Sequence, residues 1–197
     1  MSTLTRQLSA ALRILLVLTV VCGIAYPLAV LGVGQVVARD RADGSLLVRD
    51  GAVVASSSLG QQVTDPQWFQ GRRSASEYAG TTSGGSNLGP NYPRQKQAVN
   101  GAREALVTAN PDAAGPPPDD ALTASASGLD PDISVAYAAW QVPRVAAARG
   151  LSTVQVQALV DAHTKGRLLG FLGQPRVNVT ELNLALTDGA TGPRPAV

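Results

Sequence analysis

A glycine-rich segment in the middle of the chain has residue types that could bind an anion. The segment comprises Ser83, Gly84, Gly85, Ser86 and Asn87. Successive backbone N–H groups in such a loop can surround a phosphate, so these five residues form a candidate nucleotide site. A P-loop also needs a Lys-Ser/Thr pair after its last glycine, and here no lysine occurs before Lys96. The alternative is a fixed turn in which Asn87 and the glycines adopt left-handed conformations.

The titratable residues do not assemble a catalytic centre. His163 is the sole histidine, and the chain has no G-x-S-x-G segment that would supply a nucleophilic serine. We interpret His163 as a buried, hydrogen-bonded residue of an apolar helical face. Asp130 and Asp132 flank a proline and could bind a cation, but this pattern ahead of a helix favours a turn and cap. The sequence predicts no catalytic residue, no metal site and no cofactor of its own.

A second group of residues suits contact with another protein. Arginine pairs with carboxylates and stacks on aromatic rings, and tryptophan buries a large area at interfaces. The candidate partner interface comprises Trp68, Arg72, Asp130, Arg176 and Asn178. The alternative is that Trp68 belongs to the core of the domain and that the arginines form surface pairs.

An α+β domain with a β-hairpin and several helices would position these residues. The hairpin is predicted within residues 44–62, because Asp-Gly at 50–51 is a strong turn signal between two apolar segments. Residues 63–91 show no clear period and are predicted as a long ordered loop. A helix is predicted over residues 93–109, and it must stop near Asn110 because a proline follows.

The carboxyl-terminal third carries the clearest helix signals. Ser134 can cap a helix, Pro143 would end or kink it, and residues 144–149 would continue as a second helical piece before Gly150.

Two more capping patterns follow. One begins at Ser152 and predicts a helix that ends at Gly166. The other begins at Asn178 and favours a short helix over residues 179–186, although the alternating leucines there leave a strand as the alternative.

An apolar segment precedes this domain. Residues 14–37 contain no charged side chain, and a helix of this length reaches roughly 36 Å, enough to cross a hydrocarbon core of about 30 Å. Gly23, Gly32 and Gly34 would allow close approach to another helix, although glycine is also simply common in such segments. Pro27 is a candidate kink.

The predicted organisation is a short amino-terminal tail (1–13), a transmembrane helix (14–38), one domain (39–187) and a flexible tail (188–197). Arg6 and Arg13 precede the helix and Arg39 and Arg41 follow it. The number of positive charges is therefore nearly equal on its two sides and does not decide the orientation. A short basic amino terminus before one helix more often stays in the cytoplasm, which predicts an external domain.

Charge and cysteine content exclude several classes of protein. The chain has 16 basic and 14 acidic residues, and without Arg6 and Arg13 the remainder is balanced at 14 of each. A balanced domain argues against nucleic acid or an anionic membrane surface as the main partner. Cys22 is the only cysteine, so neither a disulfide framework nor a cysteine zinc site can form.

Four segments resemble the KdpC subunit of the Kdp-type potassium-transporting ATPase. They are SGGSNLGP at 83–90, LTASASGLDPDIS at 122–134, QVPRVAAARGL at 141–151 and LVDAHTKGRLLGFLGQPRVNVTELNLAL at 159–186. The resemblance extends over the whole chain, including the single amino-terminal helix. Two positions depart from the family pattern, namely Arg73 in place of proline and Asp132 in place of histidine.

The resemblance implies a non-catalytic accessory subunit of a bacterial inner-membrane complex for potassium uptake. Its partners would be a channel-like potassium-binding subunit, a P-type ATPase subunit and the membrane. The resemblance implies a catalytic chaperone that raises the ATP affinity of the ATPase subunit. Any role of ATP would therefore come through the complex, and this chain would have no cofactor of its own. An external domain cannot meet cytoplasmic ATP; it would instead cap the potassium entrance or lock the assembly, with any ATP effect indirect.

Overall fold

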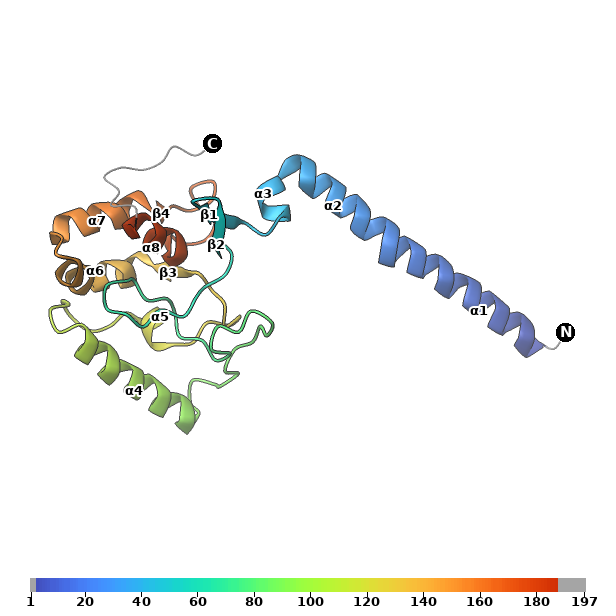
Figure 1. Cartoon of the computed structure of the whole chain (residues 1–197). Helices are drawn as coiled ribbons and strands as arrows, with labels where there is room; N and C mark the ends of the chain where they lie inside the picture. Colours follow the sequence, from blue (N-terminus) through green and yellow to red (C-terminus); the bar gives the residue numbers. More distant parts are fainter. Residues whose placement is uncertain (1–2, 188–197) are drawn as a thin grey trace. The chain divides into compact units, whose positions relative to one another are not determined.

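The computed structural model describes residues 3–187 and divides the chain into two compact units near Leu46 (Figure 1). Since the predicted flexible tail spans residues 188–197, it lies outside the described residues. The mixture of helices and small antiparallel sheets confirms the α+β prediction.

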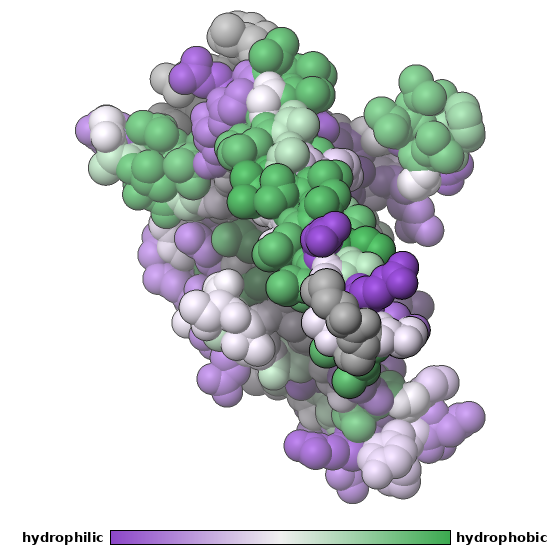
Figure 2. Space-filling model, turned by 90° about the vertical axis from the view of Figure 1, so that its right-hand side faces the viewer, coloured by the Kyte–Doolittle hydropathy of each residue, from purple (hydrophilic) through white to green (hydrophobic). Residues whose placement is uncertain are grey.

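The first unit is dominated by one long apolar helix. α1 (Thr3–Val20), a π-helical turn (Val21–Ala25) and α2 (Tyr26–Val37) follow one another without a break, and α3 (Arg39–Ala42) adds a short turn. The helix therefore includes most of the residues that were predicted as an amino-terminal tail. None of its residues is buried, and Figure 2 shows the hydrophobic side chains that cover it. Its length and composition suffice to cross a membrane.

Pro27 accounts for the π-helical turn. Proline has no N–H with which to bond the carbonyl of Gly23, four residues earlier, so the regular helical pattern cannot continue there. In the structure the Tyr26 N–H bonds the carbonyl of Val21, five residues back. A π-turn is one of the recognised ways in which a helix absorbs such a break.

The second unit begins with the predicted hairpin. β1 (Leu46–Arg49) pairs with β2 (Ala52–Ser56). Asp50 and Gly51 have φ angles of 51° and 78°, as a two-residue turn of the primed type requires. Apart from an isolated bridge at Arg73, the next 36 residues form no helix or strand, as predicted for residues 63–91.

α4 (Pro93–Ala109) has the predicted bounds, with Asn110 as its carboxyl cap. α5 (Asp119–Leu122) is a single turn in the proline-rich connector. α6 (Val135–Arg149) is capped by Ser134 and ends at Gly150, which is left-handed with φ 65°. The alternative that Pro143 ends the helix was wrong, because α6 continues through it as one helix.

α7 (Thr153–Ala162) begins with the complete predicted capping box. The prediction that it continues to Gly166 was wrong. The His163 N–H bonds the carbonyls of Leu159 and Val160, and the chain then forms β4 (Thr164–Lys165). Sheet pairing ends this helix before the glycine.

A three-stranded antiparallel sheet joins the carboxyl-terminal segments. β5 (Arg176–Asn178) lies between β3 (Asp132–Ser134) and β4, with Ile133 and Thr164 both opposite Val177. α8 (Val179–Thr187) follows β5 directly, and its Glu181 N–H donates to Asn178 Oδ1 at 3.0 Å. The predicted helix is confirmed, and the strand alternative for this segment was wrong.

The core lies around α6. It contains fifteen buried apolar side chains, drawn from the 63–91 loop, α5, the sheet and α6–α8. They are Phe69, Ala121, Ile133, Tyr137, Ala138, Trp140, Val142, Val145, Ala146, Val156, Val160, Val177, Val179, Leu182 and Leu186. α4 contributes no buried residue and packs mainly through half-buried side chains such as Leu106.

Candidate functional site

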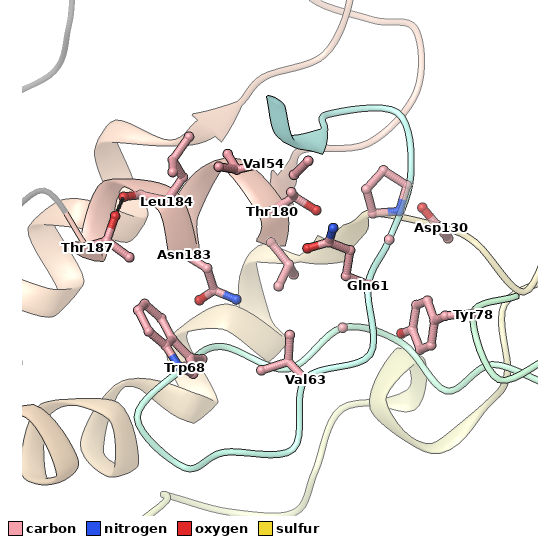
Figure 3. Close-up of a pocket in the computed structure, with 15 residues that line it drawn as sticks. Val54, Gln61, Val63, Trp68, Tyr78, Asp130, Thr180, Asn183, Leu184 and Thr187 are labelled. Atoms are coloured by element: carbon pink, nitrogen blue, oxygen red, sulfur yellow. Dashed lines mark hydrogen bonds between the residues drawn. The ribbon is translucent and has the colours of Figure 1, made fainter. Parts of the chain in front are cut away.

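A pocket of about 240 Å³ lies between the hairpin, the segment after it and α8 (Figure 3). Val54, Val63, Trp68 and Leu184 supply apolar surface, and among the residues that line it Asp130 is the one with a charge. Such a pocket suits a small, largely apolar group rather than a phosphate, because it offers no cation to an anion.

The polar groups around this pocket are used by the fold itself. The Asn183 amide donates to the Phe69 carbonyl at 2.8 Å and accepts from the Phe69 N–H at 2.9 Å. The Tyr78 hydroxyl donates a hydrogen bond to the Arg72 carbonyl. Asp130 faces Arg72, with 3.3 Å between Oδ2 and Nη1. These contacts hold parts of the domain together. They leave no free acid and base side by side that could act in catalysis.

The first three of the five glycine-rich residues, 83–85, pack against the segment around Ser127. The Gly84 N–H and the Ser83 hydroxyl both donate to the Ser127 carbonyl, at 2.8 and 3.1 Å. A Cβ on Gly85 would lie 2.9 Å from the Ala126 carbonyl oxygen, whereas a Cβ on Gly84 would meet nothing within 4 Å. The two loops approach so closely at this position that a side chain would clash, which explains why residue 85 is a glycine.

The expected left-handed turn is present only at Asn87, whose φ is 54°. The prediction that the glycines share this conformation was wrong for Gly84, Gly85 and Gly89. Ser86 and Asn87 are exposed. The segment is thus a docked loop whose outer end faces solvent.

The candidate interface residues contact other parts of the domain. The Arg149 guanidinium lies 3.9 Å from the centre of the Trp68 ring, and Trp68 is half-buried. Arg176 pairs with Asp132 at 2.8 Å, from β5 to β3. Asn178 is buried, caps α8 and donates to the Ser57 carbonyl at 2.8 Å. Each has an intramolecular role that the structure makes explicit.

The two departures from the family pattern also make specific contacts. Arg73 Nη1 donates to the carbonyl of Ala98 at 2.9 Å and to that of Leu122 at 3.4 Å, which ties the loop to α4. Asp132 supplies the carboxylate for Arg176. Burial raises the pKa of Asp132, and Arg176 opposes that shift.

His163 is half-buried rather than buried, and its Nδ1 lies 2.8 Å from the Leu159 carbonyl. This bond, made within the end of α7, agrees with the predicted hydrogen-bonded residue. No group of three or more His, Cys, Asp or Glu side chains that could hold a metal occurs within residues 3–187.

Sequence reasoning missed a polar network that α6 extends toward the 63–91 loop. The buried Arg144 donates to Asn110 Oδ1 and Gln141 Oε1, both at 2.7 Å, and to the carbonyls of Pro66 and Trp68. Gln141 also bonds the backbone of Gln70 in both directions. Two long polar side chains three residues apart in an apolar helix were the available signal.

The three helix glycines occupy different surroundings. A Cβ on Gly32 would meet nothing within 4 Å, and one on Gly23 would lie 3.9 Å from a methyl of Thr19. A Cβ on Gly34 would lie 3.5 Å from Ala42 of α3. Gly23 and Gly32 thus leave open surface on the helix, while Gly34 faces the chain's own next turn.

Comparison with known proteins gives a consistent result over nearly the full length. The family model for KdpC, the c chain of the K+-transporting ATPase, matches residues 8–188. A potassium-transporting ATPase KdpC subunit of Sorangium cellulosum is 53% identical over 187 residues, covering 93% of this chain and 98% of the relative. The proteins of the same name from Paraburkholderia phytofirmans and Kineococcus radiotolerans are 52% and 50% identical, covering 87% and 96% of this chain and 91% and 97% of their own lengths. The chain described here, from its apolar helix to α8, belongs to the KdpC family of potassium-transporting ATPase subunits.

Proposed function

We propose that this protein is a membrane-anchored accessory subunit that stabilises an ATP-driven potassium uptake complex. The observation that carries the proposal is the family match, which includes both the apolar helix and the domain. Family membership identifies the chain as an accessory subunit, with ATP hydrolysis on another subunit of the complex. The partners we propose are a channel-like potassium-binding subunit and a P-type ATPase subunit.

We propose that the amino terminus is cytoplasmic and the domain lies outside the bacterial inner membrane. The apolar helix is long and apolar enough to cross the bilayer once, and Arg6 and Arg13 lie in its amino-terminal half. Basic residues near the amino-terminal end of a single membrane-spanning helix favour this orientation.

A catalytic-chaperone effect on ATP affinity would then be indirect. In this proposal the domain biases the conformation of its partners, and the ATPase subunit responds at a distance. Two features support an indirect effect. The glycine-rich loop is docked on residues 126–128, and the pocket between the hairpin and α8 carries a carboxylate instead of a cation.

Cysteine labelling of intact cells tests the orientation. Ala114→Cys in a Cys22→Ser background places one thiol on an exposed loop. We expect an impermeant maleimide to label it before lysis. Protection until lysis would place the domain inside and overturn the external orientation.

Two glycine variants test whether ATP contacts this chain. Gly84→Ala adds a methyl group that meets no atom within 4 Å, so it perturbs the outer surface of the loop without disturbing its docking. We expect the assembled complex to keep its ATP dependence. A raised KM for ATP with intact assembly would instead assign the nucleotide to this loop, and Gly85→Ala serves as the control for altered docking.

A further inference from the structure

The loop between β4 and β5 presents a cluster of large apolar side chains to solvent. Leu168, Leu169, Phe171 and Leu172 are 68%, 76%, 68% and 48% exposed. Single exposed hydrophobic residues are ordinary, but a contiguous group indicates a surface that another apolar phase covers. We call residues 168–172 the apolar loop.

Backbone hydrogen bonds hold the apolar loop in a defined turn. The Leu168 N–H donates to the Leu172 carbonyl and the Leu172 N–H returns the bond, both at 2.9 Å. Leu169 and Gly170 have φ angles of 54° and 83°. A closed turn of this kind displays its apolar side chains outward at little additional entropic cost on binding.

The strand that follows the apolar loop ends beside the segment that leaves the β1–β2 hairpin. Asn178, at the end of β5, donates to the Ser57 carbonyl just after β2, and Thr180 donates to the Leu59 carbonyl at 3.3 Å. Figure 1 shows the loop and the β1–β2 hairpin on this same side of the domain. Val48 and Val53 of the hairpin are exposed as well.

Covalent connection limits how far this side can lie from the apolar helix. Residues 38–45 separate the end of α2 from β1. At full extension such a segment reaches about 30 Å, whatever the arrangement of the two units. If the helix spans a membrane, β1, which lies on the same side of the domain as the apolar loop, starts within about 30 Å of the end of the spanning helix.

The charges beside the apolar loop favour lipid headgroups. Arg167 immediately precedes it, and within residues 3–187 Arg167 makes no ion pair. Lys165 and Arg176 stand at the strand ends, paired with Glu181 and Asp132. Leucine and phenylalanine beside a basic residue are the composition of segments that lie in the membrane interface.

We propose that the apolar loop inserts into the bilayer interface and gives the domain a second attachment to the membrane. This inference rests on the proposed function in one respect, namely that residues 3–37 span the bilayer. The loop would then fix the orientation of the domain at a second point, in addition to the covalent connection to the helix.

Depth-dependent quenching in liposomes tests the proposal with the full chain. Leu169→Cys in a Cys22→Ser background is labelled with an environment-sensitive fluorophore, and the bilayer contains doxyl-labelled phosphatidylcholine with some phosphatidylglycerol. Val154→Cys is the matched control, because Val154 is also 76% exposed but lies on α7. We expect several-fold stronger quenching at position 169 than at 154, abolished by adding Phe171→Glu.

A third label separates failure of the loop from failure of the anchor. Cys22 of the otherwise unchanged chain lies within the apolar helix and reports its insertion. Quenching at Cys22 without quenching at 169 would overturn the loop proposal alone. Protection of position 169 from aqueous iodide only in the assembled complex would assign the loop to a neighbouring subunit and likewise overturn it. Absence of quenching at Cys22 would overturn the anchor.

Discussion

At the scale of single residues, the domain depends on a buried arginine, Arg144, that forms no ion pair with a carboxylate of residues 3–187. Arg144 is 7% exposed and satisfies its guanidinium with amide and carbonyl oxygens. Burial lowers the pKa of Arg144, because desolvation disfavours the charged form. The acceptors come from the 63–91 loop, Asn110 and α6. One side chain therefore connects three segments that no common helix or sheet joins.

Replacing Arg144 should therefore be costly. Arg144→Met keeps much of the volume but leaves the acceptors of Asn110 and Gln141 without their donor, and we expect a loss of about 3 kcal/mol of unfolding free energy. Denaturant unfolding of the purified chain measures it. Arg94→Met, on the exposed face of α4, is the control; equal stability of both variants would contradict the structural role of Arg144.

Asp132 should make stability depend on pH in a specific direction. Its pKa is raised, chiefly by burial, so its contribution to stability is complete below the unfolded pKa and is lost as the pH rises through the folded one. We expect Asp132→Asn to gain stability relative to the parent as the pH rises above the ordinary aspartate value. Denaturant unfolding over a pH series measures this trend.

Asp65 provides a control of opposite sign. The Gln67 N–H lowers the pKa of the exposed Asp65, so its contribution is present above the unfolded pKa and is lost on acidification. Asp65→Asn should therefore lose stability relative to the parent as the pH rises over the same series. Parallel trends for the two variants would contradict the assigned causes.

At the scale of elements, docking of the glycine-rich loop makes a prediction about two adjacent glycines. Gly85→Ala places a methyl group against the Ala126 carbonyl oxygen and should cost about 1–3 kcal/mol. Gly84→Ala meets open space and should change stability by less than about 1 kcal/mol. Thermal unfolding of the two variants checks the difference, and equal destabilisation would show that the loop is not docked as described.

Elements with local signals were predictable from the sequence. Ser134, Ser152 and Asn178 each cap a helix through a bond to a residue three positions later, so a short stretch of sequence suffices. The strand Thr164–Lys165 was missed because it exists only through pairing with β5, about ten residues away. The Arg144 network was missed for the same reason, since its acceptors span residues 66–141.

At the scale of the whole molecule, the core of the domain contains no residue from the apolar helix. All fifteen of its members lie between Phe69 and Leu186. A protease site inserted between Gly44 and Ser45 should therefore release a domain with the unfolding midpoint of the intact chain. Calorimetry before and after cleavage measures this, and a markedly lower midpoint would show that the helix supports the fold.

The position of α8 after the other core elements also sets the order of events during synthesis. The apolar helix is synthesised before the domain, but the core lacks Leu182 and Leu186 until α8 has been added. At usual elongation rates the intervening residues take roughly 8–30 s. If the apolar helix directs the nascent chain to a membrane, the domain is still unfolded when the chain arrives, and an external domain would be translocated as an extended polypeptide before Phe69 acquires its neighbours on α8.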